Sequence, residues 1–169
     1  MRIPKARVPQ VAAQILQSLI QHKDVETENP NEVQLDIEAV LNQYVRDEQE
    51  ISEKARDLIA KRGLPSSQLS RVKQQLAEQR QLKIGDEAID YLVDQLIEFL
   101  MHSHNVDEIY APDHRLRRLI REPLRQIGDA EGALRDEVRA QMKHVKEGTA
   151  VWEVEYQRIL EDVRRRKGL

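Results

Sequence analysis

The stretch from Asn29 to Arg62 constrains the fold more than any other part of the chain, because its pattern predicts one long helix. Asn29 and Pro30 are typical of the N-cap and of the first helical position, and Glu32 completes a capping box. Gly63 favours a left-handed helix end, and the proline two residues later cannot continue the helix. Apolar residues recur between these ends at helical spacing and form a stripe that another element must cover. They are Val33, Ile37, Val40, Leu41, Tyr44, Ile51, Ala55, Leu58 and Ile59.

The composition of the 169 residues indicates an all-α protein. Glycine and proline number six each and aromatic residues make up 4%, whereas leucine, glutamine, glutamate, arginine and alanine are abundant. A hydrophobic fraction of 40% beside 34% charged residues is typical of a soluble globular chain. No segment has the roughly 20 apolar residues that span a bilayer, so we expect no membrane insertion.

The absence of cysteine excludes disulfides, cysteine-ligated zinc and thiol catalysis. It is compatible with the cytoplasm, where we expect the protein to reside. The formal net charge of -3 gives no general reason to expect nucleic acid or an acidic membrane as a partner. Charge is nevertheless uneven, because residues 24–57 contain eleven acidic side chains against three basic ones.

The apolar pattern of the first half of the chain recurs in the second half. An offset of 81 residues aligns Val8 with Ile89, and an offset of 83 continues the match farther along. The order and spacing of three consecutive helices agree, which favours an internal duplication over the chance alignment of amphipathic helices. We therefore predict two tandem helical units, 1–81 and 82–169. Each has an amphipathic first helix, a long central helix and a shorter closing helix.

The central helix of the second unit has a different pattern. Pro123, Gly128 and Gly132 fall in the segment that matches the long helix of the first unit. Proline removes a helical hydrogen bond, and glycine costs about 1 kcal/mol relative to alanine in a helix interior. We therefore predict that this helix breaks or bends between Ile127 and Gly132, and that Thr149 opens the closing helix.

A lone unit of roughly 80 residues has few means of covering both sides of its central helix. We therefore expect the two units to share one core. Separated from each other, they should be marginally stable or should associate.

Two segments resemble the start and the finish of a known family. They are Met1-Arg2-Ile3, which leads into the first amphipathic helix, and Glu147-Gly148-Thr149-Ala150-Val151-Trp152-Glu153-Val154-Glu155-Tyr156. Both resemble the bacterial domain-of-unknown-function family numbered five hundred and seven, and the resemblance covers nearly the whole chain. Some members resemble a single copy, so this chain resembles a tandem version. The first unit departs from the closing pattern at residues 63–69. The resemblance implies no activity for any residue.

The densest set of candidate metal ligands lies where the most apolar helix gives way to a turn. Imidazole and carboxylate are ligands that zinc or manganese takes. The alternative is a polar helix end, at which a histidine interacts favourably with the helix dipole. Two of the histidines are two residues apart, so they point in nearly opposite directions if both are helical. The candidate ligands are His102, His104, Asp107 and His114.

Four arginines form a basic face opposite an apolar stripe in the second unit. The face can bind an acidic protein partner or phosphates, or it is a solvated face whose aliphatic stems cover apolar neighbours. No aromatic residue is interleaved for base stacking, which argues against nucleic acid. The four residues are Arg117, Arg118, Arg121 and Arg125.

The sequence favours an uncharacterised helical interaction or structural protein that binds an unknown protein partner and has some capacity for self-association. A small metal-dependent enzyme centred on His102 to His114 is the first alternative, and a nucleic-acid-associated factor is the second. We expect no cofactor. No catalytic residue is assigned, because the chain has no phosphate loop, nucleophile elbow or zinc-protease helix.

Overall fold

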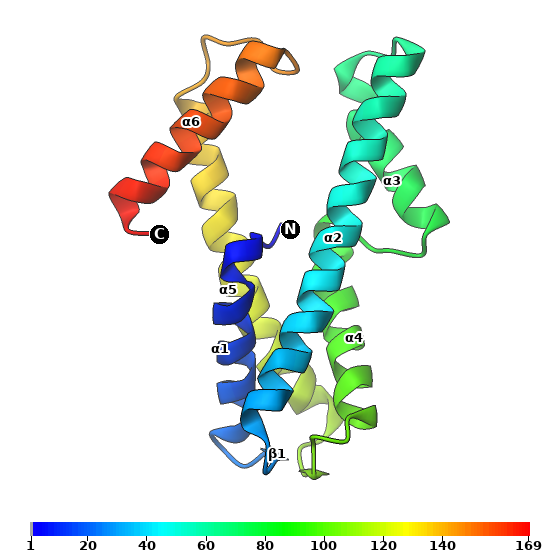
Figure 1. Cartoon of the computed structure of the whole chain (residues 1–169), viewed down its shortest axis with the longest axis vertical. Helices are drawn as coiled ribbons and strands as arrows, with labels where there is room; N and C mark the ends of the chain where they lie inside the picture. The colour runs from blue at the N-terminus through cyan, green and yellow to red at the C-terminus, as the bar shows by residue number, and fades with distance from the viewer. Residues whose placement is uncertain (1) are drawn as a thin grey trace. The chain divides into compact units, whose positions relative to one another are not determined.

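The computed structural model describes residues 2–169 and confirms the prediction of an all-α protein. Within these residues there are six α-helices and a single sheet of two very short strands (Figure 1). The elements are α1 Val8–Ile20, β1 Val25–Glu26, α2 Pro30–Arg62, α3 Leu69–Gln79, α4 Ala88–His102, β2 Glu108–Ile109, α5 Asp113–Ala140 and α6 Ala150–Lys167. Single 3-10 turns precede α1, α3 and α4 at Lys5–Arg7, Ser66–Gln68 and Gly85–Glu87.

Helix α2 is uninterrupted from Pro30 to Arg62, as the sequence predicts. Gly63 ends it in the left-handed conformation, with a φ of 60°. The N–H of Leu64 donates to the carbonyl of Ile59 at 3.1 Å, which is the long bond of a Schellman motif. Asn29 occupies the N-cap position, although its side chain makes no capping hydrogen bond within residues 2–169. The predicted ends of the helix are therefore correct.

Helix α5 has no break where the sequence predicted a break or a bend, so the prediction of a broken helix is wrong. It continues from Asp113 to Ala140, across the segment from Ile127 to Gly132 where the break was expected. Pro123 lies inside the helix and is buried. A glycine in a helix costs only about 1 kcal/mol, whereas burial of one leucine contributes about 1.5–3 kcal/mol. Burial of Leu134, only 2% exposed, therefore offsets the cost of a nearby glycine.

The chain divides into two compact units, Met1–Ile127 and Gly128–Leu169. The boundary falls inside α5, which contributes its first half to one unit and its second half to the other. We refer to them as the large unit and the small unit.

One hydrophobic core runs through the large unit and draws side chains from α1, α2, α4 and α5. Helix α3 packs along the later turns of α2 (Figure 1). Because the core residues come from both halves of the sequence, neither half supplies the core alone. Its largest fully buried side chains include Ile15, Leu19, Ile37, Leu41, Leu92, Leu96, Leu116, Ile120 and Leu124.

The two strands join the turn after α1 to the turn after α4. They are antiparallel, with Val25 opposite Ile109 and Glu26 opposite Glu108. The main-chain N–H of Tyr110 extends the pairing by donating to a carbonyl before β1 at 2.9 Å. Residues about 80 positions apart in the sequence are thereby held together at one end of the large unit.

The small unit is a helical hairpin built from the second half of α5 and from α6. Thr149 caps α6 as predicted, because its Oγ1 accepts the N–H of Trp152 at 3.2 Å. The rings of Trp152 and Tyr156 stack with centroids 5.0 Å apart. The small unit has its own core of Leu134, Val138, Met142, Ile159 and Val163.

Candidate functional site

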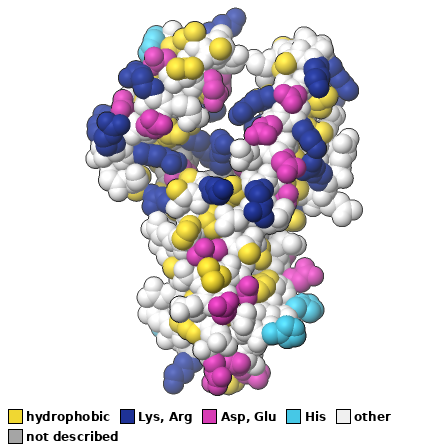
Figure 2. Space-filling model, viewed as in Figure 1, with side chains coloured by type: hydrophobic (Ala, Val, Ile, Leu, Met, Phe, Trp, Pro, Cys, Tyr) yellow, Lys and Arg dark blue, Asp and Glu magenta, His cyan; other side chains and the backbone are white. Residues whose placement is uncertain are grey.

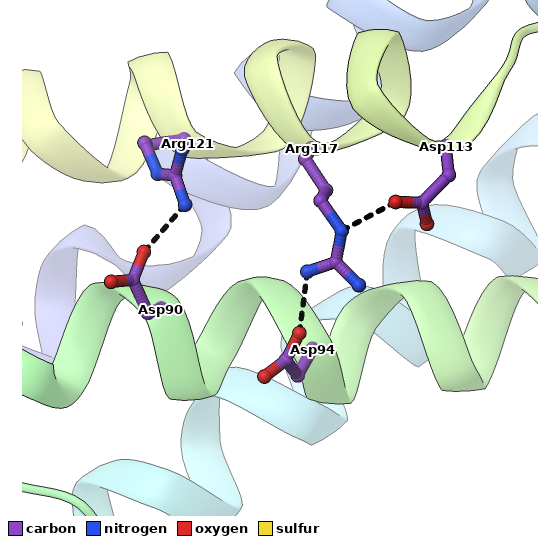
Figure 3. A network of polar contacts seen from close by, with 5 residues as sticks. All are labelled: Asp90, Asp94, Asp113, Arg117 and Arg121. Atoms are coloured by element: carbon purple, nitrogen blue, oxygen red, sulfur yellow. Dashed lines mark hydrogen bonds and ion pairs between the residues drawn. The ribbon is translucent and has the colours of Figure 1, made fainter.

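The four arginines of the predicted basic face do not act as one surface. Arg117 and Arg121 point towards α4 (Figure 3). Nη1 of Arg117 lies 2.5 Å from Oδ1 of Asp94, and its Nε lies 2.7 Å from Oδ2 of Asp113. Nη2 of Arg121 lies 2.5 Å from Oδ1 of Asp90. Arg117 and Arg121 are therefore engaged in ion pairs, chiefly with the aspartates Asp90 and Asp94 of α4.

Arg118 and Arg125 lie elsewhere on α5. Nη2 of Arg125 is 3.2 Å from Oε1 of Glu122, and Nε2 of Gln126 is 3.1 Å from the same oxygen. These hydrogen bonds, that from Arg125 first, lower the pKa of the Glu122 carboxyl. Arg118 is exposed and has no hydrogen bond or ion pair with residues 2–169. Arg118 therefore differs from Arg117 and Arg121, whose guanidinium groups are paired with aspartates.

Arg118 lines an open groove of about 500 Å³ between α1 and α5. Two apolar side chains form the base of the groove: Leu119, which is half-buried, and Pro123, which is buried. The other lining residues are polar, and most of them carry amides. The complete lining is Gln14, Gln17, Ser18, Gln21, Arg118, Leu119, Glu122, Pro123 and Gln126.

The α1 side of this groove carries no charge, since residues 8–21 contain neither an acidic nor a basic side chain. Gln14, Gln17 and Gln21 are exposed, and their side-chain amide groups make no hydrogen bonds within residues 2–169. Glutamines on α2 differ: Gln34, for example, donates to a glutamate one turn away at 3.2 Å. The sequence analysis did not single out this groove. The polar but uncharged face of the first helix was the signal that could have indicated it.

A second set of polar contacts lies at the β1–β2 end of the large unit, where acidic and histidine side chains gather (Figure 2). The carboxylate of Asp24 is buried, with the residue 7% exposed. Nε and Nη2 of Arg115 lie 2.7 and 2.9 Å from its two oxygens. Oγ1 of Thr27 donates to the carbonyl of Asn105 at 2.5 Å. These contacts join the first half of the chain to the second, and we assign them to the fold.

The four candidate metal ligands are not gathered into a site. Nδ1 of His102 lies 2.8 Å from a main-chain carbonyl one turn earlier, and His104 and His114 are exposed. Oδ2 of Asp107 accepts the N–H of Glu28 at 2.7 Å. Within residues 2–169, no three histidine, aspartate or glutamate side chains are placed so that they could share a metal ion.

The small unit carries a groove of its own, of about 470 Å³, between α6 and the turn that follows α5. Ile159 lies at its base and is buried. The remaining lining residues are polar or charged. The complete lining is Gln141, His144, Glu155, Arg158, Ile159, Asp162, Arg165 and Arg166.

Comparison with known proteins places the chain in a family. Among the described residues, no helix combines the length and the apolarity needed to cross a membrane. No curated protein matches the sequence. The whole chain, residues 1–169, matches the family described as "Protein of unknown function (DUF507)", in agreement with the resemblance of its two ends. The chain therefore belongs to this family.

Proposed function

We propose that the protein is a helical interaction protein that binds a protein partner in the groove between α1 and α5. The observation that carries the proposal is the unused hydrogen-bonding capacity of Gln14, Gln17, Gln21 and Arg118 around an apolar base. Interface cores are depleted of charge and combine apolar contact with a limited number of hydrogen bonds. The uncharged face of α1 has this composition.

A protein segment suits the groove better than a small metabolite. Each glutamine amide offers both donors and an acceptor, so it can pair with the N–H and C=O groups of a peptide main chain. The base formed by Leu119 and Pro123 can receive an apolar side chain. Arg118 can pair with a carboxylate of the partner, because the nearby Glu122 is already hydrogen-bonded by its neighbours.

The proposal also covers the origin of the similar order of elements in the two halves of the sequence. We propose that residues 1–81 and 82–169 are duplicated units that share the core of the large unit. The repeated order of a 3-10 turn, helix, short strand and long helix supports this view. The strand register also supports it. At an offset of 83, Val25 corresponds to Glu108 and Glu26 to Ile109, so the pairing is reciprocal, as two-fold symmetry requires.

We also propose that the protein acts in the bacterial cytoplasm and that self-association accompanies partner binding. The absence of cysteine supports a cytoplasmic location, because disulfides rarely persist in the reducing cytoplasm and cysteine therefore has no such structural role there. Gel filtration of the full chain over a range of concentrations measures self-association directly.

Site-specific crosslinking in cells tests the groove. A photoreactive amino acid replaces Gln17 in the tagged full-length protein, and a control chain carries it at Gln75, which is exposed on α3. We expect a crosslinked protein of defined mass only from position 17. The substitution Arg118→Glu should remove that product, whereas Lys54→Glu, an exposed charge reversal on α2, should leave it.

Both charge reversals should leave the thermal transition nearly unchanged, because exposed charges contribute little to stability. Equal crosslinking from positions 17 and 75, or a product that is insensitive to Arg118→Glu, would refute the groove as the binding site.

A further inference from the structure

The groove of the small unit has a charge distribution that the proposed protein-binding function does not explain. Its two carboxylates both face Arg158. Nη2 of Arg158 lies 2.8 Å from Oε2 of Glu155, and its Nη1 lies 3.7 Å from Oδ2 of Asp162. Both carboxylates of the groove are therefore paired with the same cation within the small unit, and the three arginines of the lining outnumber its two carboxylates.

The other basic residues of the lining have no such partners. His144, Arg165 and Arg166 make no hydrogen bond or ion pair through their side chains within residues 2–169. The two basic residues that flank Arg165 and Arg166 in α6 are paired with carboxylates. Nη2 of Arg164 lies 3.0 Å from the buried Glu131, and Lys167 pairs with a glutamate of α5 at 2.5 Å. The last turn of α6 thus uses two cations to hold the hairpin and presents two to the groove.

Basic residues in the last turn of a helix are favourable in any case, because they complement the helix dipole. The interaction with the helix dipole involves only the basic residues of α6 and does not require hydrogen-bond donors from another segment of the chain. Here the amide of Gln141 and the imidazole of His144, from the turn after α5, line the same groove as Arg165 and Arg166. Figure 2 shows the basic side chains over α6 interspersed with acidic ones, so the site is local rather than a broad basic surface.

We propose that this groove binds a phosphate group, either as the free ion or on a small organic phosphate. Guanidinium groups offer paired N–H donors that match the oxygens of a phosphate, and the side chains of Gln141 and His144 add hydrogen-bonding groups from a second segment. The volume of about 470 Å³ falls in the range of small-molecule sites. The proposal is independent of the groove between α1 and α5.

The test uses the full-length protein and nuclear magnetic resonance of the arginine Nε–Hε groups. Inorganic phosphate, adenosine monophosphate and citrate are titrated separately at constant ionic strength. We expect saturable shifts confined to Arg165 and Arg166 with phosphate, with adenosine monophosphate, or with both. The affinities of inorganic phosphate and adenosine monophosphate, compared with each other, show whether the groove prefers the free ion or the ester.

The variant R165Q/R166Q lacks these two signals, so its affinity is measured by isothermal titration calorimetry beside that of the natural sequence, and phosphate binding should weaken at least tenfold. The matched variant K143Q/K146Q removes the same charge from exposed positions outside the groove lining and should change binding less than twofold. Equal loss in both variants, or shifts of all arginines that do not saturate, would mean general charge screening and would overturn the proposal. Binding of a 12-nucleotide RNA without binding of either phosphate compound would also overturn it.

Discussion

Asp24 is one of the buried polar residues of the described chain, together with Ser52 and Glu131. Its carboxylate is nearly buried, and the forked guanidinium of Arg115 contacts both oxygens. Removing one partner of a buried ion pair is costly, because the remaining charge keeps its desolvation without its counter-ion. The contact joins the turn after α1 to the start of α5, so it also fixes two distant segments of the chain.

We predict that Asp24→Asn lowers the free energy of unfolding by about 1.5–3 kcal/mol, which is the usual range for a hydrogen bond to a charged group. The partial exposure of Arg115 keeps the value at the lower end of effects seen for buried pairs. Asp57→Asn, an exposed change on α2, is the control and should be neutral. Urea denaturation of both variants measures the difference. Equal stability of the two variants would show that the buried pair contributes nothing.

Tyr44 provides a prediction about pH. Burial, followed by the charge of Glu48, raises the pKa of its phenol, and the hydroxyl donates to the carbonyl of Lys83 at 3.1 Å. The unfolded chain therefore releases this proton at lower pH than the folded chain. The stability due to the neutral phenol is complete below the unfolded pKa of about 10 and decreases as pH rises above it.

We expect Tyr44→Phe to be less stable than the natural sequence at pH 7 by about 1 kcal/mol, through loss of the hydrogen bond. Between pH 9 and about 11 the stability of the variant should fall less steeply. Denaturation at several pH values measures both slopes. Parallel slopes would contradict the assignment of the pH effect to Tyr44.

Among the elements, α5 departs most from what its sequence predicts. Gly132 lies in an uninterrupted helix, and a Cβ built at that position meets no other atom within 4 Å. Neither close packing nor a left-handed backbone therefore requires the glycine. We predict that Gly132→Ala stabilises the small unit by about 0.5–1 kcal/mol, through helix propensity and reduced freedom of the unfolded chain.

Ala133 offers a matched control for this element, because it is exposed on the same helix. Ala133→Gly should destabilise the small unit by a similar amount. Amide hydrogen exchange in the second half of α5 reports both changes. Slower exchange in Gly132→Ala and faster exchange in Ala133→Gly is the expected result. Faster exchange in Gly132→Ala would show that the backbone there needs glycine.

The sequence predicted α2 well and α5 poorly for a physical reason. The ends of α2 depend on local chemistry, such as the left-handed Gly63, which can be recognised from a few neighbouring residues. The continuity of α5 depends on tertiary burial of residues such as Leu134, which local propensity does not include.

The same distinction applies to the candidate sites. The arginines of α5 were recognisable from the sequence as a charged face. The pairing of Arg117 with Asp94 depends on which helices are neighbours, and periodicity does not contain that information. The groove between α1 and α5 was missed because the residues that line it from the two helices are about 100 positions apart in the sequence.

At the scale of the whole molecule, the central claim is that both halves of the sequence build one core in the large unit. Ile37 and Leu41 from the first half are buried in the same cluster as Leu92 and Leu116 from the second. The boundary between compact units instead falls at Ile127. A division at residue 81 should therefore disrupt the core, whereas a division after residue 127 should preserve it.

Thermal unfolding of three fragments, followed by circular dichroism, tests this claim most directly. We predict that residues 1–127 unfold in one cooperative transition. Residues 1–81 alone should show no such transition and should gain one when mixed with residues 82–169. The opposite result would contradict the shared core: a fragment 1–81 that unfolds cooperatively as a monomer and has no affinity for 82–169.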